Sequence, residues 1–299
     1  MRIFLTGATG FIGSAIAQEL LGAGHEVLGL ARSDDKAQSL RQLGIEAHRG
    51  DLADADSLVA GAKQCDGVIH TAFNHDFANV SLTESAEVDV RVIAAMAQAL
   101  EGTGKPLVIA SGTAIVASGS GELASETDAP AVTTGRAVSE QTIQTAATRG
   151  VRSSVVRLPP TVHGAGDKGF VPMFVDIARR TGVAAYVGEG DNRWPAVHRL
   201  DAARLFRLAV ENAEPGARLH AVAEEGVPMR SIAQTIGEGL GIPVKSLSAD
   251  EAGAHFGWMG GFVGLDNRTS SALTREKFGW NPTQIELLED MKRNGYFSG

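Results

Sequence analysis

MRIFLTGATGFIG, residues 1–13, contains the pattern that decides the fold of this chain. Residues 1–6 form a short apolar run that predicts a strand, and apolar residues recur at helical spacing through 11–21. The turn between them carries Gly7, Gly10 and Gly13. This order is typical of a dinucleotide-binding loop, in which glycines permit the tight turn, the approach of a pyrophosphate and close helix packing. The N–H groups at the start of the helix then hold the phosphates.

The bulk composition limits the class of protein. A length of 299 residues suits one large α/β domain or a domain with a smaller lobe. The formal net charge of −8 gives no basic surface, so nucleic acid is not an expected partner. Cys65 is the only cysteine, which excludes an internal disulfide and a cysteine-rich metal site, and we expect no metal. Because no apolar run approaches the roughly 20 residues that span a bilayer and no targeting segment is visible, we expect a cytoplasmic protein that binds no membrane.

Strand and helix patterns alternate through the first half of the chain. Apolar runs predict strands at 1–6, 26–30, 45–49, 67–70, 106–110 and 152–158, and the longest helical patterns lie at 86–100 and 134–148. This alternation favours an α/β fold with a doubly wound parallel sheet, the Rossmann architecture.

The regular alternation ends after Leu158, where prolines and glycines crowd a loop. A helix at 200–213 and a strand at 218–222 then return the chain to the sheet. We expect a nucleotide-binding Rossmann domain at 1–163, rejoined by about 197–223, and a smaller substrate-binding lobe at 164–196 and 224–299. Ligands bind at the carboxyl ends of the strands in open α/β sheets, so the lobe is expected to cover that edge.

Five segments occur in an order that matches one known family. They are TGATGFIG at 6–13, GDL at 50–52, SGT at 111–113, RLPPTVHG at 157–164 and NRWPAVHRLDAARL at 192–205. Together they resemble the short-chain dehydrogenase/reductase superfamily, in its extended and atypical branches (NAD(P)-dependent epimerase/dehydratase-like). The resemblance covers nearly the whole chain and implies a nicotinamide dinucleotide as the cofactor.

The resemblance also implies which residues hold that cofactor. GDL is similar to a segment whose aspartate contacts adenine, and RLPPTVHG to a segment that meets the nicotinamide. The implied cofactor-binding residues are Thr6, Gly7, Thr9, Gly10, Phe11, Ile12, Gly13, Asp51, Leu52, Thr71, Ala72, Arg136, Pro159, Thr161 and His163. An aspartate before a helix is also an ordinary helix cap, so Asp51 is either an adenine contact or a cap.

The chain departs from the family at the reaction centre. There the family pairs a tyrosine with a lysine four residues later, and the lysine charge lowers the pKa of the tyrosine. The register of the motif places Arg136 in the lysine position and Val132 in the tyrosine position. The only tyrosines are Tyr186 and Tyr296, so the nucleotide-binding half contains no phenol. Asp89 likewise stands where many relatives carry asparagine.

Other side chains are candidates to act in place of the tyrosine. Ser111 and Thr113 follow the strand at 106–110, where a hydroxyl polarises a substrate oxygen, although a serine there is also an ordinary turn residue. His163 and His75 follow other strand ends; histidine is a residue type suited to proton transfer, and each position is equally consistent with a polar loop. Arg136 is expected to bind the nicotinamide ribose but not to act as an acid.

The end of the second strand favours NADP as the cofactor over NAD. NAD-preferring enzymes carry an acidic residue there to bind the ribose 2′-hydroxyl, whereas this chain has Arg32 and Ser33. Arg32 can bind a 2′-phosphate with two hydrogen bonds, and Ser33 can add a hydroxyl. Asp34 and Asp35 follow and are consistent with the start of the next helix. A surface arginine in a turn is the alternative interpretation of Arg32.

Arg193, His75 and Tyr186 are the candidate substrate-binding residues. Arg193 stands where sugar-nucleotide relatives bind a diphosphate, or else it stacks on Trp194 at the surface. Tyr186 either reaches over the cofactor or is a half-buried aromatic of the lobe. The many aromatic residues of the lobe suggest an apolar pocket, although they are also suited to fill its core.

Three functions follow from these observations. The first is an NADP-dependent oxidoreductase that transfers hydride to or from a small carbonyl or alcohol substrate. The second is a nucleotide-sugar epimerase or dehydratase, which Arg193 motivates. The third is a non-catalytic NADP(H)-binding sensor protein, which the missing tyrosine and lysine motivate. The helices at 86–100 and 134–148 have small-residue faces, and relatives pair them into a homodimer, so a homodimer is also expected.

Overall fold

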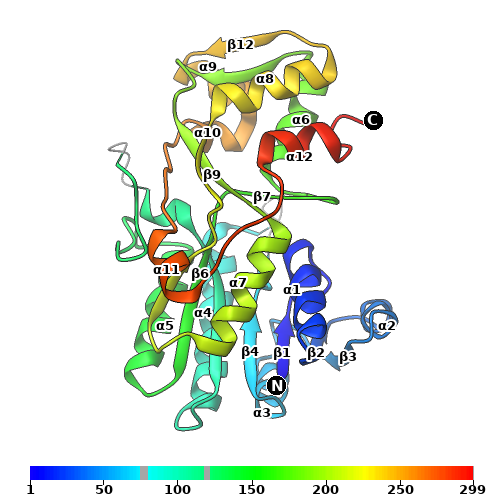
Figure 1. Cartoon of the computed structure of the whole chain (residues 1–299), viewed down its shortest axis with the longest axis vertical. Helices are drawn as coiled ribbons and strands as arrows, with labels where there is room; N and C mark the ends of the chain where they lie inside the picture. Colours follow the sequence, from blue (N-terminus) through cyan, green and yellow to red (C-terminus); the bar gives the residue numbers. More distant parts are fainter. Residues whose placement is uncertain (75–79, 118–121, 299) are drawn as a thin grey trace.

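The computed structural model describes residues 1–74, 80–117 and 122–298. Its largest element is a seven-stranded sheet in the order β10-β6-β5-β4-β1-β2-β3, in which every neighbouring pair of strands is parallel (Figure 1). The strands are β1 (Arg2–Thr6), β2 (Glu26–Ala31), β3 (Glu46–Arg49), β4 (Gly67–His70), β5 (Pro106–Gly112), β6 (Arg152–Leu158) and β10 (Ala217–His220). The expected Rossmann fold is confirmed.

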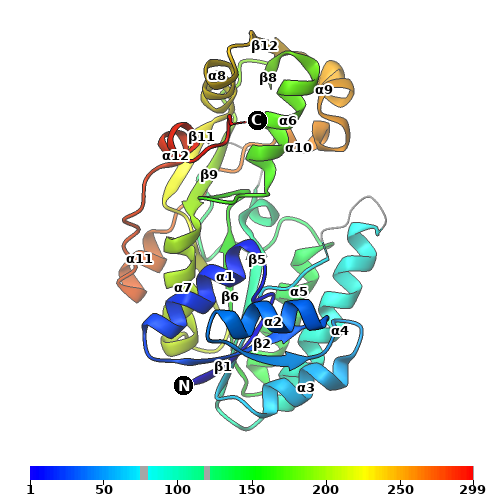
Figure 2. The ribbon, with the colours of Figure 1, turned by 90° about the vertical axis from the view of Figure 1, so that its right-hand side faces the viewer.

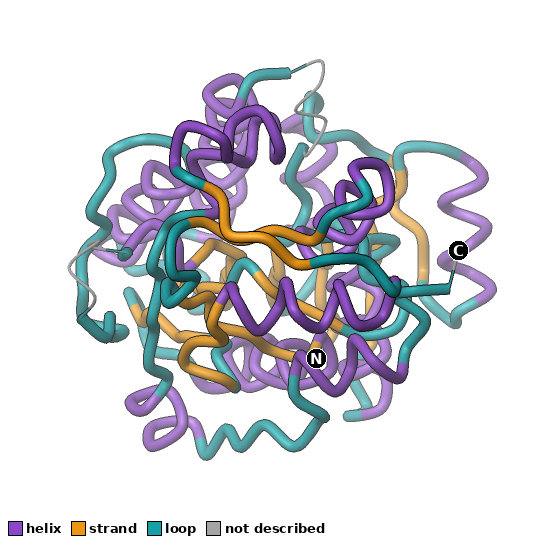
Figure 3. Tube along the Cα trace, turned by 90° about the horizontal axis from the view of Figure 1, so that it is seen from above, coloured by secondary structure: helices purple, strands orange, loops and turns teal. Residues whose placement is uncertain are grey.

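Helices cover both faces of this sheet, and they surround the strands when the molecule is seen from above (Figure 3). One face packs against α1 (Phe11–Gly22), α2 (Asp34–Gln42) and α7 (Arg199–Asn212), and the other against α3 (Ala55–Lys63), α4 (Leu82–Leu100) and α5 (Arg136–Thr148). The alternation along β1 explains the two cores, because successive side chains of a strand point to opposite faces. Ile3 and Leu5 join the core under α1 and α7, whereas Phe4 joins the core under α3 and α4.

A smaller lobe lies beyond the carboxyl edge of the sheet and has its own core (Figure 2). It contains a three-stranded sheet of β7 (Thr161–His163), β9 (Arg193–His198) and β11 (Glu224–Pro228), and a two-stranded sheet of β8 (Ala184–Val187) and β12 (Val244–Leu247). Its helices are α6 (Phe170–Thr181), α8 (Met229–Leu240), α9 (Ala249–Phe256), the 3₁₀ turn η2 (Gly257–Met259), α10 (Gly260–Val263) and α12 (Leu287–Arg293). Trp194, Phe174 and Phe256 are buried in this core, so most of the lobe aromatics fill it.

Two helix starts differ from the sequence expectation for local reasons. α4 begins at Leu82 rather than residue 86, because Ser81 and Glu84 form a capping box that satisfies the first backbone N–H groups. α5 begins at Arg136 rather than residue 134, because Gly135 precedes it with φ of +59°, a conformation outside the helical region. β5 continues to Gly112, so Ser111 lies inside the end of the strand rather than after it.

The tail of the chain does not stay in the lobe as expected. Helix α11 (Ala272–Phe278) packs against β10 and against α7, and Figure 1 shows it beside the large sheet rather than in the lobe. Trp280 is buried in the core under α7, and its indole N–H donates to the carbonyl of Asp201 at 2.9 Å. The expected lobe segment 224–299 therefore includes a stretch that stabilises the nucleotide-binding part. The burial of the Trp280 indole holds this segment against the large sheet, and no periodic pattern in the sequence predicts that contact.

Within the described ranges, no helix combines the length and the apolar character needed to cross a bilayer. In the same part of the chain, no three histidine, cysteine, aspartate or glutamate side chains form a group that could hold a metal ion.

Candidate functional site

The turn between β1 and α1 is built around its glycines. Gly7 has φ of +76°, and a Cβ on it would lie 2.7 Å from the hydroxyl of Thr71. A Cβ on Gly13 would lie 2.0 Å from the carbonyl oxygen of Gly7, so α1 packs directly on the turn. Gly10 precedes the helix without a side-chain cap, and the first turn of α1 has no acidic residue. The N–H groups at this helix start are therefore available to an anion.

β2 is the neighbour of β1 in the sheet, so its end lies beside this turn, and β3 lies beyond β2. Arg32 is exposed directly after β2, whereas the hydroxyl of Ser33 caps α2 by accepting from the N–H of Lys36 at 3.3 Å. Asp34 and Asp35 lie in the first turn of α2. Of the two residues that follow β2, Ser33 caps α2, whereas the side chain of Arg32 caps no helix.

Asp51, after β3, is exposed, and its carboxylate accepts from the N–H of Ala53 at 2.9 Å. The cap of α3 is Asp54, so Asp51 is a turn residue and not the helix cap. Leu52 packs against the core under α3 and α4.

A buried polar network connects the end of β1 with the end of β4. The hydroxyl of Thr6 lies 2.7 Å from Nδ1 of His70 and accepts from the N–H of Ala72 at 3.3 Å. The hydroxyl of Thr71 donates to the carbonyl of Thr6 at 2.8 Å. On its other side, Nε2 of His70 lies 3.0 Å from Oδ1 of Asp89, which is on α4. A carboxylate only accepts, so Nε2 carries a proton and donates to Asp89.

Arg136 joins the network from the start of α5. Its Nη1 donates to Oδ2 of Asp89 and to the carbonyl of Ala110, each at 3.2 Å, and its guanidinium stacks 3.8 Å from the centroid of the Phe73 ring. The hydroxyl of Ser139 donates to the same carboxylate oxygen. Burial opposes ionisation of Asp89, but the hydrogen bond from His70, the charge of Arg136 and the hydroxyl of Ser139 together hold its pKa below the usual value.

Glu140, one turn after Arg136, fixes the register of α5. Glu140 accepts two hydrogen bonds from the buried guanidinium of Arg157 on β6, at 2.9 and 2.8 Å. Val132 precedes the helix and is 45% exposed. Arg136, not Val132, therefore faces the end of β5.

Ser111 and Thr113 mark the carboxyl end of β5. The hydroxyl of Ser111 is buried and has no hydrogen-bond partner in the described structure. The hydroxyl of Thr113 lies 3.0 Å from the side-chain amide of Asn267, which comes from the segment after α10. Ser111 is therefore the hydroxyl that is left for a ligand, and Thr113 ties this end of the sheet to the lobe.

The segment from β6 to β7 leads into the lobe. Pro159 is buried, and the hydroxyl of Thr161 donates to the carbonyl of Pro195. His163 is 1% exposed, with Nδ1 at 3.0 Å from Oδ2 of Asp290 and with no partner for Nε2. The structure thus places His163 in a buried position beside Asp290 rather than in an open loop.

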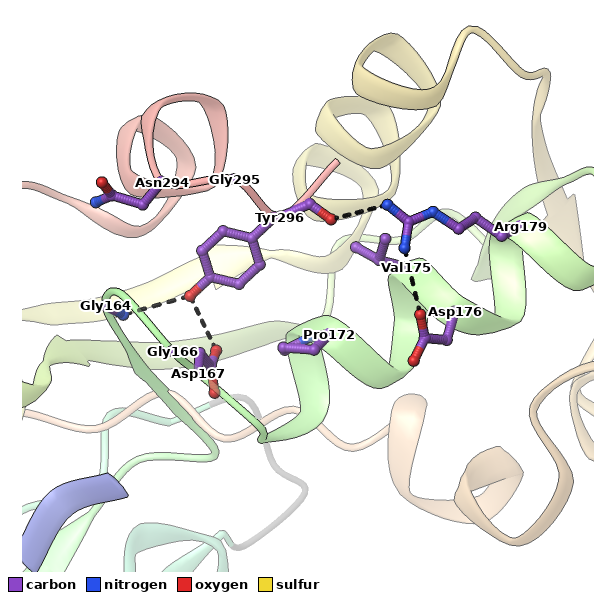
Figure 4. Close-up of a pocket in the computed structure, with 10 residues that line it drawn as sticks. All are labelled: Gly164, Gly166, Asp167, Pro172, Val175, Asp176, Arg179, Asn294, Gly295 and Tyr296. Atoms are coloured by element: carbon purple, nitrogen blue, oxygen red, sulfur yellow. Dashed lines mark hydrogen bonds and ion pairs between the residues drawn. The ribbon is translucent and has the colours of Figure 1, made fainter. Parts of the chain in front are cut away.

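The cavity shown in Figure 4 lies in the lobe and contains the second tyrosine. It has a volume of about 210 Å³. The hydroxyl of Tyr296 donates to Asp167 at 2.9 Å and accepts from the N–H of Gly164 at 3.3 Å. Burial, followed by the charge of Asp167, raises the pKa of Tyr296. The lining includes no residue of the glycine turn or of β5, so this phenol lies apart from the candidate cofactor-binding loop.

The candidate substrate residues are not brought together. Tyr186 lies on β8, at the end of the lobe away from the large sheet, and the guanidinium of Arg230 lies 5.5 Å from its ring (Figure 2). Arg193 is exposed at the start of β9, while Trp194 beside it is fully buried, so the alternative in which this pair stacks at the surface does not hold. His75 lies outside the described residues.

Sequence analysis missed the role of two residues of the network. The sequence pattern places His70 in a strand and shows Asp89 as a departure from the asparagine of the resembling family, but it predicts no contact between them. A histidine that ends a buried apolar strand, followed by an acid on an otherwise apolar helix face, is the sequence signal for such a pair, because buried charges require partners.

Comparisons with known proteins agree with this geometry. A family model described as the NAD dependent epimerase/dehydratase family matches residues 3–222. The uncharacterized protein C2A9.02 of Schizosaccharomyces pombe is 51% identical over 298 residues, which cover 99% of this chain and 100% of that protein. A 2-alkyl-3-oxoalkanoate reductase of Stenotrophomonas maltophilia is 30% identical over 260 residues, which cover 81% of this chain and 77% of the reductase.

Among solved structures, a dTDP-glucose 4,6-dehydratase of Streptomyces venezuelae, with NAD and TYD bound, superposes with a TM-score of 0.79. The match covers 99% of this chain and 96% of the dehydratase at 19% identity, so it shows the shared fold. The chain belongs to the NAD dependent epimerase/dehydratase family and is an NAD(P)-dependent enzyme of the oxidoreductase, epimerase or dehydratase type.

Proposed function

We propose that this protein is an NADP-dependent oxidoreductase that transfers a hydride to or from the carbonyl or alcohol carbon of a small, fairly apolar molecule. The observation that carries the proposal is the hydroxyl of Ser111, which is buried and unpartnered at the carboxyl end of β5. A buried hydroxyl without a partner costs free energy, and a substrate oxygen would supply the missing hydrogen bond. The 30% identity with a reductase of oxo acids supports a carbonyl substrate.

The residues of the glycine turn fit a dinucleotide. The start of α1 would hold the phosphates, because no side chain caps its N–H groups after Gly10. The absence of a Cβ on Gly13 lets the helix pack directly on the turn. Arg32 would bind the 2′-phosphate of NADP. When bound there, the nicotinamide would supply or accept the hydride.

The chain's own groups would handle the substrate oxygen. Ser111 would donate a hydrogen bond to it, and the fixed charge of Arg136 would favour the negative charge that develops there. For the proton, the sequence offers His163, His75 or an ordered water. The burial of His163 and its hydrogen bond to Asp290 favour one of the other two sources.

The test is oxidation of NADPH by the purified protein with a panel of aldehydes, ketones and oxo acids. Ser111→Ala is expected to lower kcat about 10²- to 10³-fold, because it removes a donor to the reacting oxygen. Ser154→Ala is the matched control, since Ser154 is also a buried, unpartnered serine, in the middle of β6.

Two other outcomes would contradict the proposed oxidoreductase function, and each would favour a different alternative. Conversion of a nucleotide sugar without net oxidation of NADPH would favour the epimerase or dehydratase alternative. Saturable NADPH binding without turnover of any carbonyl or sugar would favour the sensor alternative.

A further inference from the structure

Three arginines of α7 differ in their partners. Arg204 pairs with Asp201 at 3.1 Å, and Arg207 pairs with Glu19 of α1 at 2.7 Å. Arg199, the first residue of the helix, has no carboxylate within 4.0 Å among the residues that the structure describes, although it is half-buried. Half-buried arginines normally have a counter-charge or hydrogen-bond acceptors, so this one calls for an explanation.

The position of Arg199 suggests what its partner is. Its Cζ lies 5.1 Å from the centroid of the Phe11 ring, and Phe11 is the first residue of α1, directly after Gly10. A Cβ on Gly164 would lie 3.2 Å from Cγ of Arg199, so the stem of the side chain runs closely past the loop that follows β7. Helices α1 and α7 run side by side and begin at the same edge of the large sheet (Figures 1 and 2). The guanidinium is thus held beside the glycine turn.

The start of α1 that faces Arg199 offers no negative charge to its guanidinium. The start of α1 carries the partial positive charge of a helix N-terminus, and neither a cap nor an acidic residue in its first turn compensates it. The nearby carboxylate of Asp201 already accepts from the N–H groups of Thr283 and Gln284 and from Arg204. A guanidinium beside an uncapped helix start is favourable once an anion lies between them.

We propose that Arg199 is a further cofactor-binding residue, which binds the diphosphate of the dinucleotide from the side of α7. The inference rests on the proposed function, because it requires a dinucleotide in the glycine turn. It assigns Arg32 and Arg199 to different phosphates: Arg32 to the 2′-phosphate that distinguishes NADP from NAD, and Arg199 to the diphosphate that both cofactors share.

The experiment measures the affinity of purified variants for NADPH, NADH and ADP-ribose by calorimetry or by displacement. Arg199→Ala is expected to weaken all three by a similar factor of about 10 or more, because each contains the diphosphate and a charge-assisted hydrogen bond is lost. Arg199→Lys is expected to recover part of the affinity, since it keeps the charge but not the two-pronged geometry. Arg32→Ala is expected to weaken only NADPH.

Arg41→Ala is the control for a lost surface charge, because Arg41 is exposed in the last turn of α2, and its affinities are expected to equal those of the unaltered protein. Far-ultraviolet circular dichroism checks that each variant is folded. Unchanged affinities in Arg199→Ala, or a loss confined to NADPH, would overturn the inference while the proposed function stands. No binding of any dinucleotide to the unaltered protein would overturn the proposed function itself.

Discussion

Asp89 and Arg136 form an ion pair across two helices, with Oδ2 of Asp89 at 3.2 Å from Nη1 of Arg136. The other oxygen of this carboxylate accepts from His70, whose ring also contacts the hydroxyl of Thr6. A single buried acid therefore connects the end of β1, the end of β4 and the start of α5. This connection holds the guanidinium of Arg136 at the carboxyl end of β5, where it donates to the carbonyl of Ala110.

Asp89→Ala is expected to lower the free energy of unfolding by about 3 kcal/mol, because it leaves Arg136 without its counter-charge. Urea denaturation measures the change. Asp89→Ala combined with Arg136→Met is the control: it is expected to be more stable than Asp89→Ala alone, since the uncompensated charge is gone. If the double variant is less stable than Asp89→Ala, the uncompensated charge of Arg136 is not the reason why Asp89→Ala loses stability.

The same pair gives a pH dependence with a defined sign. Burial raises the pKa of Asp89, but His70, Arg136 and Ser139 outweigh it, so the folded pKa lies below the ordinary value of 3.8. The stabilisation is therefore fully present above pH 3.8 and is lost as the pH falls through the folded pKa. The stability difference between the unaltered protein and Asp89→Asn is expected to shrink below this pH. A difference that stays constant down to the acid transition would argue against a charged Asp89.

Gly13→Ala is expected to abolish dinucleotide binding or to prevent folding, because the new Cβ would lie 2.0 Å from the carbonyl oxygen of Gly7. Gly22→Ala, in the same helix, is the matched control, since a Cβ there has nothing within 4 Å. It is expected to leave binding unchanged and to stabilise the helix by up to about 1 kcal/mol. Thermal unfolding and calorimetry compare the two variants, and equal effects would contradict the packing argument.

Arg32→Ala is expected to weaken NADPH binding about tenfold or more and to leave NADH binding nearly unchanged, because only NADPH carries the 2′-phosphate. The ratio of the two dissociation constants is the measurement. Equal losses for both cofactors would refute the preference for NADP.

His220 is expected to make stability fall in mild acid. Burial lowers its pKa from 6.5 to about 4, and its two ring nitrogens contact Arg157 and the carbonyl of Ser270. Between pH 6.5 and 4, His220 is therefore protonated in the unfolded chain but neutral in the folded protein. The free energy of unfolding decreases as the pH falls through this window. Urea midpoints across this range test the expectation against His220→Asn, in which the decline is expected to be smaller. An equal decline in both proteins would assign it to other groups.

The sequence predicted the glycine turn because its function depends on local geometry. Gly7 needs its positive φ and Gly13 needs the absence of a Cβ, and both requirements are visible as glycines at fixed spacing. The reaction centre could not be predicted in the same way. The position of Ser111 in the resemblance favoured it over Thr113, but only the structure shows that Thr113 contacts Asn267 while the hydroxyl of Ser111 has no partner among the described residues.

The amino-acid sequence by itself determined the doubly wound sheet, its strand boundaries to within about two residues and the place of the glycine turn, because apolar periodicity and turn glycines act between near neighbours along the chain. Only the tertiary structure decided the partners of His163 and Asp89, the return of Trp280 to the large core and the position of Arg199 beside Phe11. These contacts join residues far apart in sequence, and burial rather than local propensity selects them.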